Sequence, residues 1–259
     1  MAVDRTLWTQ PIIGEHWPDW HCPSCTGGYL RVKPNSFHFH EGALSRQSHN
    51  EEAFEPGWVE WRFTALLVCN NERCQEGIAV SGKGTVDQFT REDEADWDYV
   101  NVYHPQYVNP SPRLITLPED CPQPVGDALR RAMIAQWSDA SAAANHIRKA
   151  VEALLDELKQ PRYSISKKRT RHRLPLHERI VGLASRDLEL SNALLAVKWI
   201  GNEGSHRDEL TRDDVFDALD LIEDVLKTLF DDHKTRLNRL VRQINRRKGP
   251  QRRSRRGHR

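Results

Sequence analysis

The hydrophobic pattern divides the chain into a strand-like first part and a helical last part. Residues 58–68 (WVEWRFTALLV) are rich in β-branched and aromatic side chains, which is typical of a β-strand. Residues 77–86 (GIAVSGKGTV) are predicted as the returning strand, and residues 69–74 between them as a tight turn. The first part is therefore predicted to be β-rich.

After residue 125 the apolar residues recur at spacings of three and four, the period of an α-helix. This pattern predicts helices over about residues 125–137, 138–159, 176–184 and 188–200. Thr211 and Asp214 resemble a capping box, with Asp in place of the usual Glu, so the last helix is expected to begin there. Its apolar stripe continues to Ile244, which predicts a helix of about 30 residues.

Six of the 14 prolines lie within residues 105–124, where proline favours an extended loop. We therefore predict an α+β protein with a β-rich domain over residues 1–104, a Pro-rich connector over 105–124, a helical domain over 125–235, and a helix end with a basic tail over 236–259.

Residues 162–173 carry six Lys and Arg and no acid, and are predicted as a loop. That loop could form a basic track for phosphates or could simply be solvated.

The 259 residues include no apolar run long enough to span a membrane. The first nine residues carry Asp4 and Arg5 and lack the long apolar stretch of a secretory signal, so a cytoplasmic location is expected. The net charge of +1 conceals an asymmetry: residues 236–259 hold 11 Lys and Arg and no acid, so the preceding part carries −10. Such a tail favours a polyanion partner, often nucleic acid; the alternative is a solvated tail that aids solubility.

Four cysteines form two close pairs, Cys22 with Cys25 and Cys69 with Cys74. Two such turns can supply four thiolates to zinc, so the sequence predicts a zinc ribbon. Because no position is left for water, the zinc would be structural. A pair of disulfides is the rival interpretation. His21, His38 and His40 could each replace one thiolate, and Cys121 is expected to be an ordinary side chain.

Several segments of the helical part carry a family resemblance. They are Leu117-Pro118, Pro124-Val125, residues 147–152 (IRKAVE), residues 176–180 (LHERI) and residues 198–206 (KWIGNEGSH). In this order they resemble the bacterial "domain of unknown function 4145" family over roughly residues 115–232. That family looks related to the HEPN group (higher eukaryotes and prokaryotes nucleotide-binding). The resemblance implies a helical bundle, usually dimeric, and in many HEPN members a metal-independent ribonuclease of toxin or antiviral defence systems.

Metal-free RNA cleavage needs a group that moves protons and a cation that stabilises the developing negative charge. Carried over by the resemblance, His206 would be the general acid/base and Asn202 its hydrogen-bonding partner, with Lys198 at the cationic position. HEPN nucleases carry arginine at this cationic position. Lysine keeps the positive charge but lacks the planar guanidinium group that can bind two phosphate oxygens at once. Arg148 and Glu152, four residues apart, would face the same cleft.

A structural interpretation of the same residues stays open. Gly201 and Asn202 could end a helix, with His206 bonding a free carbonyl there, and Arg148 and Glu152 could form an ordinary ion pair. The sequence thus predicts a homodimeric protein that engages nucleic acid, RNA more than DNA, as a candidate endoribonuclease. The alternative is a non-catalytic dimeric scaffold whose zinc ribbon docks a protein partner.

Overall fold

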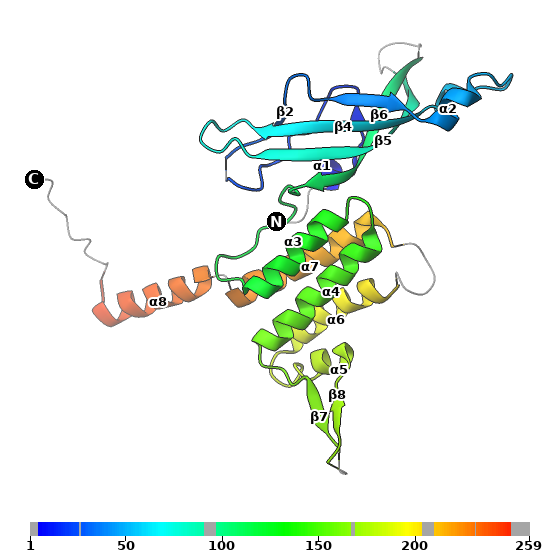
Figure 1. Ribbon diagram of the computed structural model, residues 1–259. Coiled ribbons are helices and arrows are strands. Elements are labelled where there is room, and N and C mark those ends of the chain that lie inside the picture. The colour runs from blue at the N-terminus through cyan, green and yellow to red at the C-terminus, as the bar shows by residue number, and fades with distance from the viewer. Residues whose placement is uncertain are drawn as a thin grey trace, which may run out of the picture.

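The computed structural model describes residues 5–25, 27–90, 97–166, 169–203, 210–230 and 232–249. It confirms the predicted α+β class, with an antiparallel sheet in the N-terminal part and helices in the C-terminal part (Figure 1). None of the described helices is both long enough and apolar enough to cross a bilayer.

Three long antiparallel strands form the centre of the sheet: β4 (Glu60–Cys69), β5 (Gly77–Thr90) and β6 (Trp97–Asn109). Side chains on β4 alternate between buried and exposed as a one-sided sheet requires, and Phe63, Ala65 and Leu67 point into the core. The predicted strands are confirmed. Sequence patterns missed the shorter elements, which are α1 (Arg5–Thr9), β1 (Ile12–Ile13), β2 (Leu30–Val32), β3 (His38–Glu41), α2 (Ala43–Ser48) and the short 3₁₀ helix Pro56–Trp58.

Strand β6 extends into the segment predicted as a Pro-rich loop. Pro105 lies opposite Gly82 of β5, where the register shifts at a bulge between Ser81 and Gly82. A Cβ at Gly82 would lie 2.2 Å from the carbonyl oxygen of His104, so glycine is required for this close approach. The bulge accommodates a proline that lacks the N–H of a regular ladder.

The C-terminal part contains six helices among the described residues. They are α3 (Gln123–Ala135), α4 (Ala140–Glu157), α5 (Leu176–Val181), α6 (Leu188–Glu203), α7 (Arg212–Phe230) and α8 (Asp232–Arg247). Helix α4 is central and contacts α3, α6 and α7. The capping box is confirmed: the Thr211 N–H donates to the Asp214 carboxylate at 2.9 Å, and the Asp214 N–H donates to the Thr211 hydroxyl at 3.2 Å.

The loop predicted between the helices needs correction. Residues 162–173 are not a plain loop, because β7 (Tyr163–Ile165) and β8 (Arg171–Arg173) pair as a hairpin that projects from the bundle (Figure 1). Each strand has only three residues, all of them exposed, so the alternation of Tyr163, Ser164 and Ile165 is too short to signal a strand. Helices α7 and α8 cover the span predicted as one helix up to residue 230 and again from residue 232. Residue 231 lies outside the described residues, as do residues 250–259 of the predicted tail, so the single helix stays a prediction.

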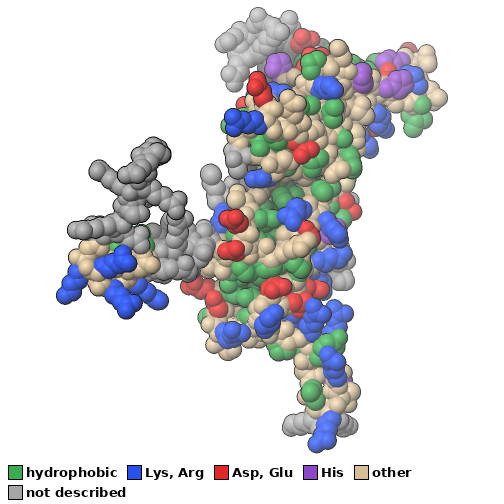
Figure 2. Space-filling model, turned by 60° about the vertical axis from the view of Figure 1, so that its left-hand side comes forward, with side chains coloured by type: hydrophobic (Ala, Val, Ile, Leu, Met, Phe, Trp, Pro, Cys, Tyr) green, Lys and Arg blue, Asp and Glu red, His purple; other side chains and the backbone are tan. Residues whose placement is uncertain are grey.

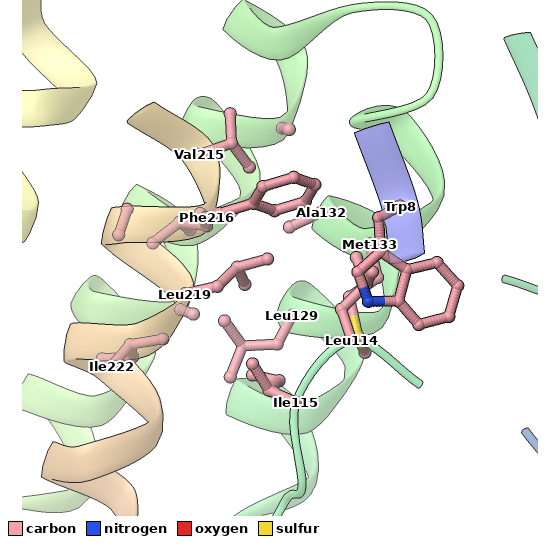
Figure 3. Packing of buried hydrophobic residues seen from close by; sticks show 14 of the residues in the cluster. Trp8, Leu114, Ile115, Leu129, Ala132, Met133, Val215, Phe216, Leu219 and Ile222 are labelled. Carbon is pink, nitrogen blue, oxygen red and sulfur yellow. The ribbon is translucent and has the colours of Figure 1, made fainter. Parts of the chain in front are cut away.

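One hydrophobic core runs through both parts of the chain. Trp8 of α1 packs against the helical bundle beside Leu114 and Ile115, which are buried although they belong to the predicted connector (Figure 3). The indole rings of Trp20 and Trp137 lie 5.1 Å apart between centroids. The connector is therefore part of the core between the sheet and the helices.

Candidate functional site

The four predicted cysteine ligands converge at one end of the sheet. Cys22 and Cys25 lie in the loop between β1 and β2, Cys69 ends β4, and Cys74 lies in the turn before β5. The Sγ atoms of Cys22 and Cys74 are 3.8 Å apart, those of Cys25 and Cys69 are 3.6 Å apart, and all four lie within 4.8 Å of one another. These distances exceed the roughly 2.05 Å of a disulfide bond. They match the ~3.8 Å between sulfurs that surround a tetrahedral ion at about 2.3 Å, so the four cysteines could hold a metal ion.

Amide groups point at the sulfur atoms. The Ser24 N–H donates to Cys22 Sγ at 3.3 Å, and the Asn71 N–H donates to Cys69 Sγ at 3.5 Å. The side-chain amide of Asn71 also donates to Cys25 Sγ at 3.7 Å. Hydrogen bonds of this kind favour the charged form of the acceptor, and the thiolate is the form that binds a metal.

Gly28 packs directly against two of the sulfurs. A Cβ at this position would lie 2.2 Å from Cys69 Sγ and 2.9 Å from Cys25 Sγ. A Cβ at the neighbouring Gly27 would have no described atom within 4 Å. The Gly28 carbonyl accepts a 2.9 Å hydrogen bond from the Cys22 N–H, so the same residue also closes the first cysteine turn. Glycine at position 28 is therefore a requirement of the cysteine cluster.

The thiols of this cluster have unequal acidities. A hydrogen bond from the Gly27 N–H lowers the pKa of Cys25 to about 6, whereas burial raises the pKa of Cys69 to about 12. A buried thiol of that kind stays neutral unless a cation offsets the cost of its charge. The donor set thus fits a bound metal ion, whose charge would let all four sulfurs ionise together.

The predicted alternative ligands do not join this group. Among the described residues, the cluster able to hold a metal contains four cysteines and no histidine. The ring of His21 lies 4.8 Å from that of Tyr29, and His38 and His40 are exposed on β3. Cys121 lies half-buried in the connector, where burial raises the pKa of its thiol.

A second feature is an open cleft of about 620 Å³ between α4, the β7–β8 hairpin and the start of α5. Its charged lining residues come from all three elements and from the segment that joins them: Arg148, Glu152, Asp156, Arg162, Arg173 and Arg179. Tyr163 of β7 adds an aromatic ring to the wall. Four arginines against two acids give this cleft a positive charge.

Asp156 fastens the hairpin and α5 to α4. Its carboxylate accepts a hydrogen bond from the buried Arg179 guanidinium at 2.6 Å and another from Arg162 Nε at 2.7 Å. Arg179 also donates to the carbonyl oxygens of Gln160 and Pro161, at 3.3 and 3.2 Å. The hydrogen bonds from Arg162 and Arg179 hold the pKa of Asp156 below its ordinary value. Arg162 and Arg179 therefore hold the walls of the cleft together through these hydrogen bonds.

The other two arginines lie where an anion could reach them. Arg148 Nε lies 3.6 Å from Glu152 Oε1, and the Arg148 side chain is 44% exposed, so the pair is loose. Arg173 is exposed on β8, and no ion pair joins it to an acid among the described residues. Of the predicted site residues, Arg148 and Glu152 thus lie together in the cleft lining.

The remaining predicted site residues belong to α6 and the segment after it. The Lys198 ammonium lies 3.5 Å from the centroid of the exposed Trp199 ring, which itself lies 5.8 Å from the ring of His177 on α5. Helix α6 continues through Glu203, so it does not end at Gly201 and Asn202. The Asn202 side chain and the whole of His206 lie outside the described residues.

Sequence reasoning missed three residues that build the cleft: Asp156, Tyr163 and Arg179. The basic run of residues 162–173 was a usable signal, because it marks the hairpin wall. No local pattern indicates that Arg179 is buried against Asp156, 23 residues earlier in the chain, since this contact depends on how α5 packs on α4.

Two family models match separate parts of the chain. Residues 130–247 match the family model "Domain of unknown function (DUF4145)", which supports the resemblance found in the sequence. Residues 10–108 match a second family model, "Domain of unknown function (DUF8608)", which covers the sheet and all four clustered cysteines. No curated protein and no solved structure matches the chain.

Proposed function

We propose that the protein binds nucleic acid, RNA in preference to DNA, through the arginine-lined cleft. The observation that carries the proposal is the excess of arginine in an open site: Asp156 is paired with Arg162 and Arg179, Arg148 is exposed and only loosely paired with Glu152, and Arg173 is exposed. Guanidinium groups bind phosphate oxygens through two parallel hydrogen bonds, which suits them to a nucleic-acid backbone.

The hairpin extends the positive surface beyond the cleft. Arg169, Arg171 and Arg173 are exposed, and residues 162–173 include no acid. Figure 2 shows Lys and Arg side chains gathered over the projecting hairpin and over the end of the bundle next to it, and a further group on α8. Phosphates along one strand could therefore contact the cleft and the hairpin together.

Equilibrium binding to a labelled single-stranded RNA at several salt concentrations tests this proposal. Each phosphate contact that is lost should reduce the slope of log K against log salt by about 1. Arg148→Ala and Arg173→Ala should each weaken binding and flatten the slope. Arg130→Ala is the control, because Arg130 is exposed on α3, does not line the cleft, and pairs closely with Asp127 at 2.7 Å. Equal behaviour of the three variants would refute binding at the cleft.

We further propose that the four cysteines hold one structural zinc ion, in a zinc-ribbon arrangement. Four thiolates complete a tetrahedral shell, so no ligand position remains for a reacting water. At such sites zinc stabilises the folded state and takes no part in catalysis. Elemental analysis of the purified protein should find one zinc ion per chain.

Cleavage of the bound RNA is the second candidate function, and the position of Arg148 and Glu152 in the cleft favours it. In this proposal His206 takes the proton of the 2′-hydroxyl as its oxygen bonds to the adjacent phosphorus, Lys198 stabilises the negative charge that develops there, and Asn202 orients the imidazole. The bond from phosphorus to the 5′-oxygen then breaks and that oxygen takes up a proton, which leaves a 2′,3′-cyclic phosphate and a 5′-hydroxyl. A homodimer would bring two such sets of residues together, as the HEPN resemblance implies.

Incubation with total RNA in EDTA tests the enzyme proposal. Cleavage that persists in EDTA and disappears in His206→Ala supports a metal-independent ribonuclease of the defence or toxin type. Because the chelator can also remove the structural metal, circular dichroism must show that the protein remains folded. Absence of both cleavage and RNA binding, with an intact dimer, would favour the scaffold, whose zinc ribbon docks a protein partner.

A further inference from the structure

One face of the β7–β8 hairpin carries an unusual combination of side chains. Tyr163 pairs with Arg173 and Ile165 pairs with Arg171, and because directly opposed residues point to the same side of a sheet, all four share a face. The opposite face carries Ser164 and His172. Tyr163 is 43% exposed and Ile165 is 75% exposed. An aromatic ring and an aliphatic side chain thus face solvent among arginines.

The orientation of the tyrosine ring is fixed by its diagonal neighbour. The guanidinium carbon of Arg171 lies 3.7 Å from the centroid of the Tyr163 ring, which is stacking distance. Tyr163 also belongs to the wall of the cleft, next to Arg162 and Arg173. The Asp156 contact to Arg162 holds the start of this strand against α4. The ring is therefore a positioned, exposed platform at the rim of the positively charged cleft.

We infer that Tyr163 and Arg171 form a stacking site for an unpaired nucleobase of the strand whose phosphates occupy the cleft. This inference rests on the proposed nucleic-acid binding and adds the kind of strand that is bound. Aromatic rings and guanidinium planes both stack on bases, and every base offers a face of this type. In a duplex the neighbouring pairs cover those faces, so the hairpin selects single-stranded segments, loops or bulges.

The surroundings favour a nucleobase over another protein as the occupant. No acid lies within residues 162–173, so the rim attracts polyanions and repels basic surfaces, including the same hairpin of a second copy. The apolar area offered is one ring and one isoleucine, which is small for a stable protein interface but matches one or two stacked bases.

The test compares two labelled RNA oligomers of equal length and charge, one with normal bases and one with abasic sugars over its central nucleotides. The full-length wild-type protein should bind the normal oligomer about 10-fold more tightly. Tyr163→Ala should bind the two oligomers with nearly equal affinity, whereas Tyr163→Phe should retain the preference for the normal oligomer. Tyr107→Ala, at a similarly exposed tyrosine of β6, is the control and should behave as wild type.

The outcomes separate this inference from the proposed function. If wild type binds both oligomers equally, with the arginine dependence described above, the cleft binds phosphates and the stacking site is refuted. If Tyr163→Ala weakens both oligomers to the same extent, stacking is also refuted. If wild type binds neither oligomer at low salt, the proposed nucleic-acid binding fails as well. Thermal unfolding of each variant confirms that the exposed substitutions leave the fold intact.

Discussion

Replacement of Gly28 by alanine is a sharp test of the cysteine cluster. The added methyl carbon would lie 2.2 Å from Cys69 Sγ and 2.9 Å from Cys25 Sγ, where ordinary contact requires at least 3.4 Å. At least one cysteine turn must therefore move by about 1 Å, whereas the sulfur positions of a metal site tolerate about 0.2 Å. Overpacking of this degree costs about 1–3 kcal/mol, which corresponds to roughly 5- to 150-fold weaker metal binding.

Competition with a chromophoric zinc chelator measures this loss directly, and thermal unfolding measures its effect on the fold. Gly27→Ala is the matched control, since a methyl carbon there meets no described atom within 4 Å and the N–H that bonds Cys25 is retained. Wild type and Gly27→Ala should bind zinc with the same affinity. If Gly28→Ala binds zinc as tightly as these two, the sulfurs do not form the metal site in the described geometry, and the argument fails.

Two further predictions concern stability. Arg162 and Arg179 lower the pKa of Asp156 below 3.8, so its charged form stabilises the fold above that pH, and this contribution disappears as the pH falls through the folded-state pKa. Asp156→Asn should therefore cost about 1–3 kcal/mol at neutral pH. In urea titrations at falling pH this difference from wild type should shrink as Asp156 becomes protonated, and a constant difference would contradict the argument. Trp137→Ala should lower the free energy of unfolding by about 3–5 kcal/mol, because this buried ring packs on Trp8 and Trp20. The control Trp58→Ala, at an exposed tryptophan, should lower it by less than about 1 kcal/mol. Equal losses in the two variants would refute the central role of the Trp137 ring.

Local signals predicted the parts of the structure that depend on neighbours in sequence. The helix of residues 140–157 follows from its apolar stripe, and the start of α7 follows from the Thr211 and Asp214 cap. The cysteine cluster was also predictable, because each pair lies on one turn and a metal ion needs both turns. In each case the residues that form the pattern lie within a few positions of one another in the sequence.

The parts that escaped prediction depend on contacts between distant segments. Trp8, Trp20 and Trp137 form one aromatic group, although the third lies more than a hundred residues after the second. A contact between residues so far apart in the sequence produces no periodic pattern of hydrophobic residues that could predict it. The hairpin escaped prediction for a different reason: each strand is exposed on both faces and has only three residues, too few for an alternating pattern to be diagnostic.

The cysteine cluster and the helical bundle are connected through the same contacts. The Arg113 side chain, in the connector, donates a 2.8 Å hydrogen bond to the carbonyl of Pro23, between the first two cysteines. Trp20 precedes Cys22 by two residues and packs on Trp137, whose ring also lies 4.9 Å below the Arg212 guanidinium. Arg212 opens α7 and donates to the Trp8 carbonyl at 2.9 Å. Because these contacts join the cysteine loop to the ends of α3 and α7, a distortion of that loop changes the packing of the bundle, and the two parts should unfold as one cooperative unit.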